Sequence, residues 1–344
     1  MKALVMKEYL RLEYVDVPNP VIKHDDEVLV RIKAASICGS DVHGYDGSTG
    51  RRKPPIIMGH EASGVIEKAG KGVHAFHVGD RVTFDSTLNC GHCEYCKSGQ
   101  VNLCDNRRVL GVSCDEYQQD GIFAEYVVIP EHILYHLPDN VDFLQASMTE
   151  PTSVAAHAIT LAPPLMGENV AVIGTGLIGL LLIKLLRGVV NGKIIAFDTD
   201  ANRLAKAKEC GADITIDSKD TDLLDQVSKA TGGRMVDRAF EAVGLSASIG
   251  TAIDVVKKGG TVTLIGNVSP KIELPLQKVV SRQLRLQGSC AIAGEYPLVL
   301  RMFESGALQV KDLISKEAPL SEGQLWFDKL YHRKDNLLKV VLIP

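Results

Sequence analysis

The sequence lacks an excess of charge of either sign, internal repeats and low-complexity segments. Its 344 residues carry 38 Lys and Arg against 42 Asp and Glu, for a formal net charge of -4. A nucleic-acid-binding surface normally needs a basic excess, so no nucleic-acid partner is expected. With 45% hydrophobic and 23% charged residues, the composition is typical of an ordinary soluble enzyme. At this length the chain can form two domains, each with its own core.

The sequence also lacks an uninterrupted apolar run of membrane-spanning length. The stretch Val170 to Val190 approaches that length, but Lys184 and Arg187 lie within it. Charges at that depth are costly in a bilayer, and a buried strand followed by a helix explains the same residues, so no membrane association is expected. The first residues, Met1 to Leu10, contain no apolar core long enough for a secretion signal, which predicts a cytoplasmic location.

The strand pattern changes near residue 150. Residues 1–150 contain short β-branched runs separated by Gly, Pro and Asp, which predict a twisted, barrel-like β domain. These runs are Glu27–Ile32, Gly64–Glu67, Arg81–Phe84 and Glu125–Ile129.

From residue 151 onwards strands alternate with helices, which predicts a parallel sheet covered by helices on both faces. The expected strands are Val170–Ile173, Lys193–Phe197, Asp237–Phe240, Thr261–Ile265 and Arg285–Gln287. The tail from 291 to 344 mixes a helix at Tyr296–Ser305 with a final strand at Leu338–Leu342. We expect the tail to return to the first domain, so that the second domain is an insertion.

A glycine-rich loop follows the first strand of this alternating region. It consists of Gly174, Thr175, Gly176, Leu177, Ile178 and Gly179. Alone the motif is a weak signal. Here it follows a predicted strand and opens a predicted helix, which places backbone N–H groups and the positive helix end against a pyrophosphate. The loop therefore predicts a dinucleotide site.

The residue that ends the next strand indicates which dinucleotide binds. Asp198 lies nineteen residues after the last glycine of the loop, where a carboxylate can accept hydrogen bonds from both adenosine ribose hydroxyls. A 2′-phosphate would meet the charge of Asp198, and no arginine follows immediately, so NAD is expected rather than NADP. Arg203 either stacks on the adenine or is a solvated helix charge.

Four cysteines form a C-x2-C-x2-C-x7-C run inside a lobe of about residues 86–107. They are Cys90, Cys93, Cys96 and Cys104. Such spacing lets one loop surround a single tetrahedral Zn²⁺ and close it to water and substrate, which predicts a structural zinc. A disulfide or redox pair is the alternative, but nothing indicates an oxidising compartment. Three more cysteines, Cys114, Cys210 and Cys290, have no partner spacing and are interpreted as packing residues.

A second candidate metal site comes from three separated segments. Cys38, the dipeptide His60-Glu61 and Glu150 offer a thiolate, an imidazole and carboxylates, all suitable for Zn²⁺. Spacing alone does not decide this, because a single cysteine is usually a small buried hydrophobe and a His-Glu pair is often a surface dipeptide.

Jointly these motifs resemble the zinc-containing medium-chain alcohol dehydrogenase family, in its branch of polyol (sorbitol-type), threonine and galactitol-phosphate dehydrogenases. The resemblance covers essentially the whole chain. It rests on Cys38–His43, Gly59–Gly64, the four-cysteine lobe, Glu150-Pro151 and the glycine loop, all in the family's order. It implies an α/β protein with a GroES-like β-barrel catalytic domain, residues 1–150 and 291–344, and a Rossmann NAD-binding domain with a doubly wound parallel sheet, residues 151–290. It also implies a homodimer or homotetramer.

The resemblance further implies two zinc ions, one structural and one catalytic. Cys38 and His60 would hold the catalytic zinc, with Glu61 and Glu150 completing the shell directly or through a water. Asp41 matches a carboxylate that orients the imidazole of His60 and strengthens it as a donor. The zinc would lower the pKa of a substrate alcohol, and a hydride would pass to the nicotinamide.

Proton release is the remaining step that the resemblance describes. Ser40 and His43 resemble a relay that carries the alcohol proton to solvent. From the residues alone, a turn or helix cap is the favoured interpretation of a serine two positions after Cys38.

The substrate is less closely defined. Arg51, Arg52 and Lys53 form a cationic run that either grips a phosphate or is a solvated turn or subunit contact. The junction that begins Glu150-Pro151 departs from what we expect of threonine dehydrogenases. The expected substrate is a secondary hydroxyl of a polyol or related carbohydrate, oxidised to the ketone. A polyol phosphate, L-threonine, a zinc-free reductase and a non-catalytic NAD-binding scaffold remain alternatives.

Overall fold

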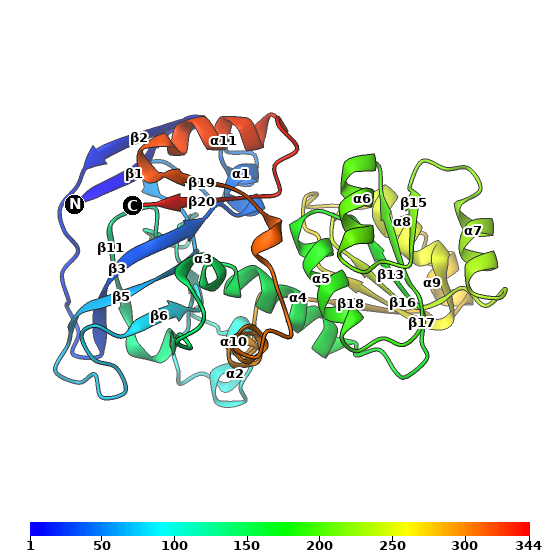
Figure 1. Ribbon diagram of the computed structural model, residues 1–344, viewed down its shortest axis with the longest axis horizontal. Coiled ribbons are helices and arrows are strands. Elements are labelled where there is room, and N and C mark those ends of the chain that lie inside the picture. Colours follow the sequence, from blue (N-terminus) through cyan, green and yellow to red (C-terminus); the bar gives the residue numbers. More distant parts are fainter. The chain divides into compact units, whose positions relative to one another are not determined.

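The structure is a computed structural model that describes all residues 1–344, and it contains two compact units. Unit 1 comprises Met1–Glu150 and Ile292–Pro344, and unit 2 comprises Pro151–Ala291. In Figure 1 unit 1 contains the blue-to-cyan strands and the orange-to-red tail, while unit 2 runs from green to yellow. The chain thus leaves unit 1 after Glu150 and re-enters it at Ile292.

Unit 1 is built on a seven-stranded sheet in the order β12-β6-β5-β3-β20-β19, with β11 also paired to β3. The strands are β3 (Glu27–Ser36), β5 (Glu61–Ala69), β6 (Arg81–Phe84), β11 (Tyr126–Pro130), β12 (Leu134–His136), β19 (Ile314–Pro319) and β20 (Lys339–Ile343). The final strand runs antiparallel to β3, with Val341 opposite Ser36, and Ser36 also lies opposite Glu61 in β5. The C-terminal strand and the start of β5 therefore lie on either side of Ser36, one strand apart in the sheet.

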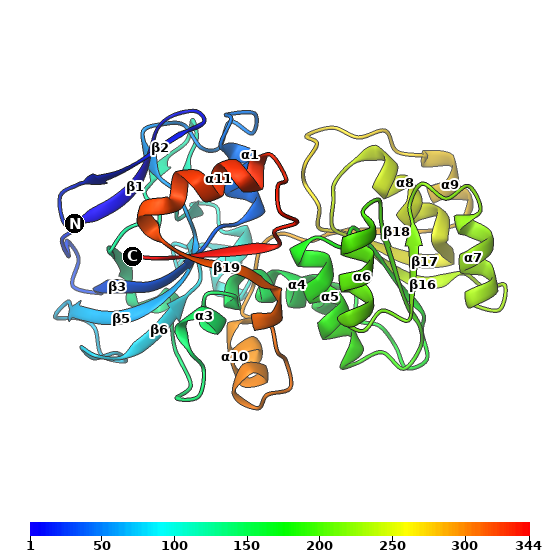
Figure 2. The same ribbon diagram turned by 45° about the horizontal axis from the view of Figure 1, so that its top comes forward.

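A smaller three-stranded sheet, in the order β2-β1-β4, completes the barrel-like wall of unit 1. Its strands are β1 (Lys2–Glu8), β2 (Arg11–Asp16) and β4 (Ile56–Ile57). Helix α11 (Gly323–Tyr331) packs on β2 and on α1 (Gly39–Gly44), as Figure 2 shows. One apolar core made by residues of both sheets fills the interior.

The other elements of unit 1 are short. The helices are α2 (Glu94–Lys97), α3 (Phe143–Ala146) and α10 (Tyr296–Glu304), with 3₁₀ turns at Val101–Leu103, Glu131–Ile133, Lys311–Leu313 and Leu320–Glu322. Two strand pairs, β7 (Thr87–Leu88) with β8 (Arg108–Val109) and β9 (Val112–Ser113) with β10 (Gln118–Gln119), frame the cysteine lobe and the segment after it.

Unit 2 contains a six-stranded parallel sheet in the order β15-β14-β13-β16-β17-β18. The strands are β13 (Val170–Ile173), β14 (Ile194–Asp198), β15 (Ile214–Asp217), β16 (Val236–Glu241), β17 (Val256–Leu264) and β18 (Arg285–Gly288). Every residue of β13 is buried, as expected for a central strand covered on both faces. The strand order reverses between β13 and β16, and ligands of doubly wound sheets bind at such a switch point.

The helices that alternate with these strands are α5 (Leu177–Arg187), α6 (Ala201–Glu209), α7 (Leu223–Ala230), α8 (Ser246–Val255) and α9 (Leu276–Ser281), and α4 (Thr149–Leu161) leads into the unit. The predicted fold class is confirmed: a barrel-like β domain and a Rossmann-type parallel sheet. The apolar stretch from Val170 is β13 followed by α5, and no helix of the structure has the length and apolarity needed to cross a membrane.

Candidate active site and metal centres

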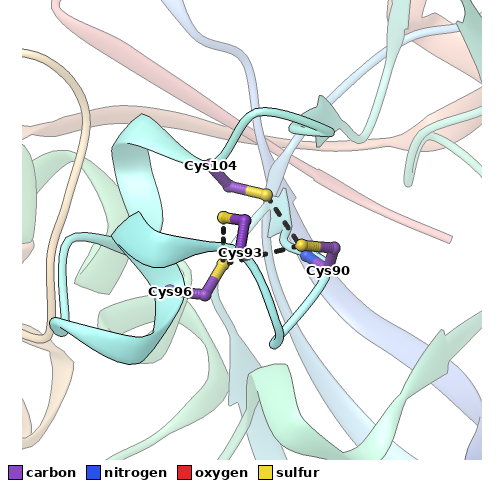
Figure 3. Close-up of side chains that lie close together, drawn as sticks. All are labelled: Cys90, Cys93, Cys96 and Cys104. Atoms are coloured by element: carbon purple, nitrogen blue, oxygen red, sulfur yellow. Dashed lines mark hydrogen bonds between the residues drawn. The ribbon is translucent and has the colours of Figure 1, made fainter.

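The four cysteines of the lobe converge on one point. Their Sγ atoms all lie within 4.8 Å of one another, and none forms a disulfide (Figure 3). The Cys93 and Cys96 Sγ atoms are 3.5 Å apart, and the backbone N–H of Cys90 donates to the Cys104 Sγ at 3.3 Å. Backbone N–H groups of His92 and Cys93 lower the pKa of the Cys90 thiol to about 6. Four thiols around one centre fit a tetrahedral zinc with no open position.

A second cluster lies at the start of β5. The ligand atoms of Cys38, His60 and Glu61 lie within 4.8 Å of one another. Cys38 is the N-cap of α1, His60 directly precedes β5, and Glu61 is its first residue. His60 and Glu61 are buried, whereas Cys38 is half-buried. Three ligands of mixed type, a thiolate, an imidazole and a carboxylate, fit a catalytic rather than a four-sulfur structural metal.

Glu150 lies near this cluster but is not one of its three converging residues. It is the second residue of α4 and is half-buried. Burial, together with the carboxylates of Glu61 and Asp85, raises the pKa of Glu150 to about 8 against the opposing effect of His60. Negative groups crowded in a poorly solvated place favour the binding of a cation.

Asp41 and Ser40 surround the imidazole of His60. The Asp41 Oδ1 lies 3.5 Å from the His60 Nδ1, on the opposite side of the ring from Nε2. Burial alone would raise the pKa of Asp41, but His60 and Arg52 hold it below its usual value. Conversely, burial opposes a charged His60, yet Asp41 and Cys38 raise the pKa of its imidazole. The predicted carboxylate thus lies beside the His60 Nδ1, although the two groups form no hydrogen bond in the structure.

Ser40 does not act as a helix cap. Its hydroxyl lies 3.3 Å from the Cys38 Sγ and 3.4 Å from the His60 Nε2, while the Cys38 thiol accepts the capping hydrogen bond from the Ser40 backbone N–H. His43 lies on the exposed side of α1, and burial together with Arg333 lowers its pKa. These positions suit a proton path from the cluster to solvent.

The glycine loop in unit 2 has the shape of a pyrophosphate cradle. Gly174 has a φ of +87°, and a Cβ on Gly179 would lie 1.9 Å from the Gly174 carbonyl oxygen. A Cβ on Gly176 would meet nothing within 4 Å, so open space lies against the loop there. Leu177 and Ile178 open α5, whose first backbone N–H groups lie beside this space.

Asp198 connects the loop to the end of β14. Its Oδ2 accepts hydrogen bonds from the backbone N–H and the hydroxyl of Thr175, at 2.7 and 3.0 Å. Its Oδ1 accepts from the backbone N–H of Thr199 at 2.7 Å. Arg203 is half-buried in α6, two residues after the start of that helix. The structure therefore places the predicted ribose-binding carboxylate at the carboxyl end of the sheet, beside the loop.

Comparison with known proteins identifies the family. Residues 24–139 match the model of the alcohol dehydrogenase GroES-like domain, and residues 178–305 match that of zinc-binding dehydrogenases. The sorbitol dehydrogenase of Halalkalibacterium halodurans is 35% identical over 353 residues, which cover 100% of this chain and 99% of that protein. The chain belongs to the zinc-containing medium-chain alcohol dehydrogenase family.

Two further relatives are named as dehydrogenases of phosphorylated polyols. D-arabitol-phosphate dehydrogenase of Enterococcus avium is 32% identical over 339 residues, covering 97% of this chain and 94% of that protein. The crystal structure of galactitol-1-phosphate dehydrogenase from Escherichia coli superposes with a TM-score of 0.91 at 27% identity, covering 100% of both chains. The predicted family is thus confirmed, and the protein is an oxidoreductase of the dehydrogenase class.

Lys339 is buried at the metal cluster, and the sequence did not predict it as a site residue. The Lys339 Nζ donates to the Glu61 Oε2 at 2.5 Å and to the Ile37 carbonyl at 3.0 Å, and Lys339 is 1% exposed. Burial opposes its charge, but Glu61 raises the pKa of this ammonium. The only signal in the sequence is a lysine at the edge of the apolar run Leu338–Leu342, 278 positions from its partner.

The side chains of Arg52 and Lys53 face different carboxylates, and the interpretation of the run Arg51-Arg52-Lys53 as a phosphate grip stays a prediction. Arg52 is 4% exposed and its guanidinium faces Asp41. Lys53 is paired with Asp115. Arg51 is exposed, and the Lys53 side chain is also 41% exposed. The sequence could not show this, because the bend that turns Arg52 inward depends on its tertiary neighbours.

The three cysteines outside the metal clusters differ from one another. Cys210 is buried, as predicted for a packing residue, and Cys114 is half-buried. Cys290 is exposed, so its interpretation as a packing residue is wrong. It lies just after the edge strand β18, where the chain runs over the surface.

Proposed function

We propose that this dehydrogenase oxidises a secondary hydroxyl of a polyol or related carbohydrate to the ketone, with NAD⁺ as the hydride acceptor. The observation that carries the proposal is the convergence of Cys38, His60 and Glu61 in a chain that also has a dinucleotide-type loop. A sorbitol dehydrogenase among its full-length relatives supports the polyol class.

In this proposal Cys38 holds a catalytic zinc through Sγ and His60 through Nε2, while Glu61 and Glu150 complete the shell directly or through a water. The zinc supplies a Lewis acid that lowers the pKa of a substrate hydroxyl. The Ser40 Oγ, 3.4 Å from the His60 Nε2, receives the proton of that hydroxyl. His43, on the exposed side of α1, delivers a proton to solvent. The four-cysteine lobe holds a second, structural zinc.

The charges around the cluster suit a divalent cation. Four groups can be anionic there, namely Cys38, Asp41, Glu61 and Glu150, and two buried cations, Arg52 and Lys339, face them. A metal of charge +2 balances the remainder. Because uncompensated charges are expensive in a buried site, this balance supports a resident divalent ion.

We also propose NAD rather than NADP. Asp198 is an acceptor at the end of β14, and the backbone N–H groups of Thr175 and Thr199 fix its two oxygens. A carboxylate in this position favours ribose hydroxyls and repels a 2′-phosphate. Arg203 is close along the chain, and we propose that it stacks on the adenine.

A free polyol is favoured over a phosphorylated one by the state of the cationic run. Arg52 is buried against Asp41 and Lys53 pairs with Asp115, so neither cation is unpaired for a phosphate in this structure. A polyol phosphate nevertheless stays the second candidate, because two relatives carry that activity in their names.

The subunits are proposed to form a homodimer or a homotetramer. Strand β18 ends the sheet of unit 2 and is largely exposed, and Leu276 and Val280 on the preceding helix α9 are 62% and 69% exposed. An open strand edge beside apolar side chains is an unstable surface in a monomer, and a second copy can cover it across a two-fold axis. We further propose a cytoplasmic location, where the free thiols of the metal clusters stay reduced.

The first experiment is NADH formation with matched pairs of polyols and their phosphates, together with L-threonine. The proposal predicts a higher kcat/KM with a free polyol than with its phosphate, and higher with NAD⁺ than with NADP⁺. Cys38→Ala, as a control, should bind one zinc ion fewer and lose turnover while still binding NADH. Preference for the phosphate partner would move the assignment to the second candidate, and no turnover by a protein that retains two zinc ions would reject both.

A further inference from the structure

Arg52 is a buried cation next to the metal cluster. The proposed function counts its charge but gives its side chain no part in the reaction. We propose that Arg52 is a positioning residue that fixes both the Asp41 carboxylate behind His60 and the direction of the Ser40 hydroxyl. This inference rests on the proposed function, because it assumes that His60 ligates a metal and that Ser40 carries a proton.

The guanidinium of Arg52 contacts both residues. Its Nε donates to the Asp41 Oδ1 at 3.0 Å, and its Nη2 lies 2.9 Å from the same oxygen. The Nη2 also donates to the Ser40 Oγ at 3.4 Å, and the Nη1 donates to the Arg51 carbonyl at 3.0 Å. One rigid group thereby joins two side chains that both contact the imidazole of His60.

The surrounding fold makes room for this side chain. A Cβ on Gly44 would lie 2.4 Å from the Arg52 Cγ, so glycine at the end of α1 admits the arginine stem. The backbone around Arg52 is anchored to β9: Ser113 donates to the Arg51 carbonyl at 3.2 Å, and Lys53 donates to the Ser113 carbonyl at 3.1 Å. The inward position of Arg52 is therefore held by a glycine and by two backbone hydrogen bonds.

At Asp41 the arginine determines which nitrogen of His60 is free. The two Arg52 donors hold the Asp41 Oδ1, which also faces the His60 Nδ1 at 3.5 Å. A carboxylate at Nδ1 requires the proton there and leaves the lone pair of Nε2 for a metal. Without Arg52, Asp41 would be a buried carboxylate with only this long contact, free to turn away from His60.

At Ser40 the arginine determines where the hydroxyl proton points. A guanidinium has donors only, so the Ser40 Oγ must accept from Arg52 and direct its own hydrogen to another acceptor. The acceptors within reach are the Cys38 Sγ at 3.3 Å and the His60 Nε2 at 3.4 Å, both atoms of the metal cluster. Lysine cannot reproduce the two-armed contact, because it has a single point charge in place of a planar fork.

The test compares Arg52→Met and Arg52→Lys with Arg51→Met, which removes the exposed neighbouring cation. The main measurement is the rate of zinc transfer to a coloured chelator. Zinc release from the two sites should give two kinetic phases. The phase that is missing in Cys38→Ala belongs to the catalytic site. Loss of a group that orients a ligating histidine typically weakens metal binding ~10–100-fold. We expect about that acceleration in Arg52→Met for the catalytic zinc alone, with unchanged release of the lobe zinc and unchanged NADH binding.

Steady-state kinetics supply the second measurement. We expect kcat to fall in Arg52→Met while the KM for NAD⁺ stays unchanged. Arg52→Lys should recover zinc retention better than kcat, because a lysine can pair with Asp41 but cannot also orient Ser40. Zinc release and kcat within twofold of Arg51→Met would overturn the inference. If Arg52→Met loses both zinc ions through misfolding, Arg52→Lys decides by the same criterion. A wild-type protein that holds two zinc ions but oxidises no polyol would reject the proposed function. The zinc release rates of the Arg52 variants would still show whether Arg52 positions Asp41 behind His60.

Discussion

Two carboxylates at the metal cluster each form an ion pair with a buried cation. Glu61 is paired with Lys339 and Asp41 with Arg52, and all four side chains are at most 5% exposed. Taking such groups out of water costs several kcal/mol for each ion, and their attraction offsets the cost only with good geometry and further hydrogen bonds. These pairs are therefore poor devices for stability alone. Their value here is to hold two carboxylates in fixed positions around His60.

Removing the lysine should expose this cost. In Lys339→Met the buried Glu61 loses its ionic partner, and we expect the free energy of unfolding to fall by about 3–5 kcal/mol. The single tryptophan, Trp326, lies in α11 of unit 1, so its fluorescence during urea unfolding reports the unit that contains the pair.

The double variant Glu61→Gln with Lys339→Met provides the control for this prediction. With both charges removed, most of the lost stability should return, because the penalty comes from the unpaired carboxylate. Strictly additive losses in the double-mutant cycle would show that the two side chains do not interact energetically.

At the scale of elements, two glycines at the start of α5, Gly176 and Gly179, have different surroundings. Gly179→Ala places a Cβ 1.9 Å from the Gly174 carbonyl, so the loop must shift, and we expect reduced stability of unit 2 and lost NADH binding. Gly176→Ala meets no protein atom within 4 Å and has an ordinary φ of -67°. Its methyl group instead occupies the space that we assign to the pyrophosphate.

We therefore expect Gly176→Ala to keep the wild-type melting temperature of the free protein and to weaken NADH binding at least tenfold. Thermal unfolding without cofactor and a fluorescence titration with NADH measure the two effects. Unchanged NADH affinity in Gly176→Ala would place the cofactor elsewhere.

The strands differ in how well the sequence predicts them. The five strands predicted for unit 2 are all found. Two of them, β13 and β14, are buried throughout, as expected of apolar runs covered on both faces. The sixth, β15, was not predicted: Ile214–Asp217 is short, partly exposed and alternates with polar residues. In unit 1 three predicted runs lie within β3, β5 and β6, and Glu125–Ile129 overlaps β11. The hairpin of β1 and β2 and the strand β19 were missed. Their pairing depends on distant partners more than on their own composition.

At the scale of the whole molecule, the open edge at β18 predicts self-association. Val280→Asp places a charge on α9, beside that edge, and we expect it to shift the protein toward the monomer in light scattering after size exclusion. Val189→Asp is the matched control, because Val189 is also exposed, at 59%, but lies after α5. Dissociation by both variants, or by neither, would contradict an interface at β18.

The chain also separates its chemistry between the two units. All metal ligands proposed here belong to unit 1, including Glu150 as its last residue before the insertion, and the nucleotide loop belongs to unit 2. Metal loss should therefore leave NADH binding intact, as the Cys38→Ala control tests.

Features that depend on local spacing were decided by the sequence itself. The four-cysteine lobe, the His-Glu dipeptide, the glycine loop and the carboxylate nineteen residues later each use a short segment, and spacing along a strand, turn or helix fixes where such side chains point. Only the tertiary structure revealed that Lys339 reaches Glu61 and that Arg52 turns inward to Asp41. Both contacts depend on where β20 and the segment beside β9 come to lie, and a buried charge is stable only where the complete fold supplies its partner.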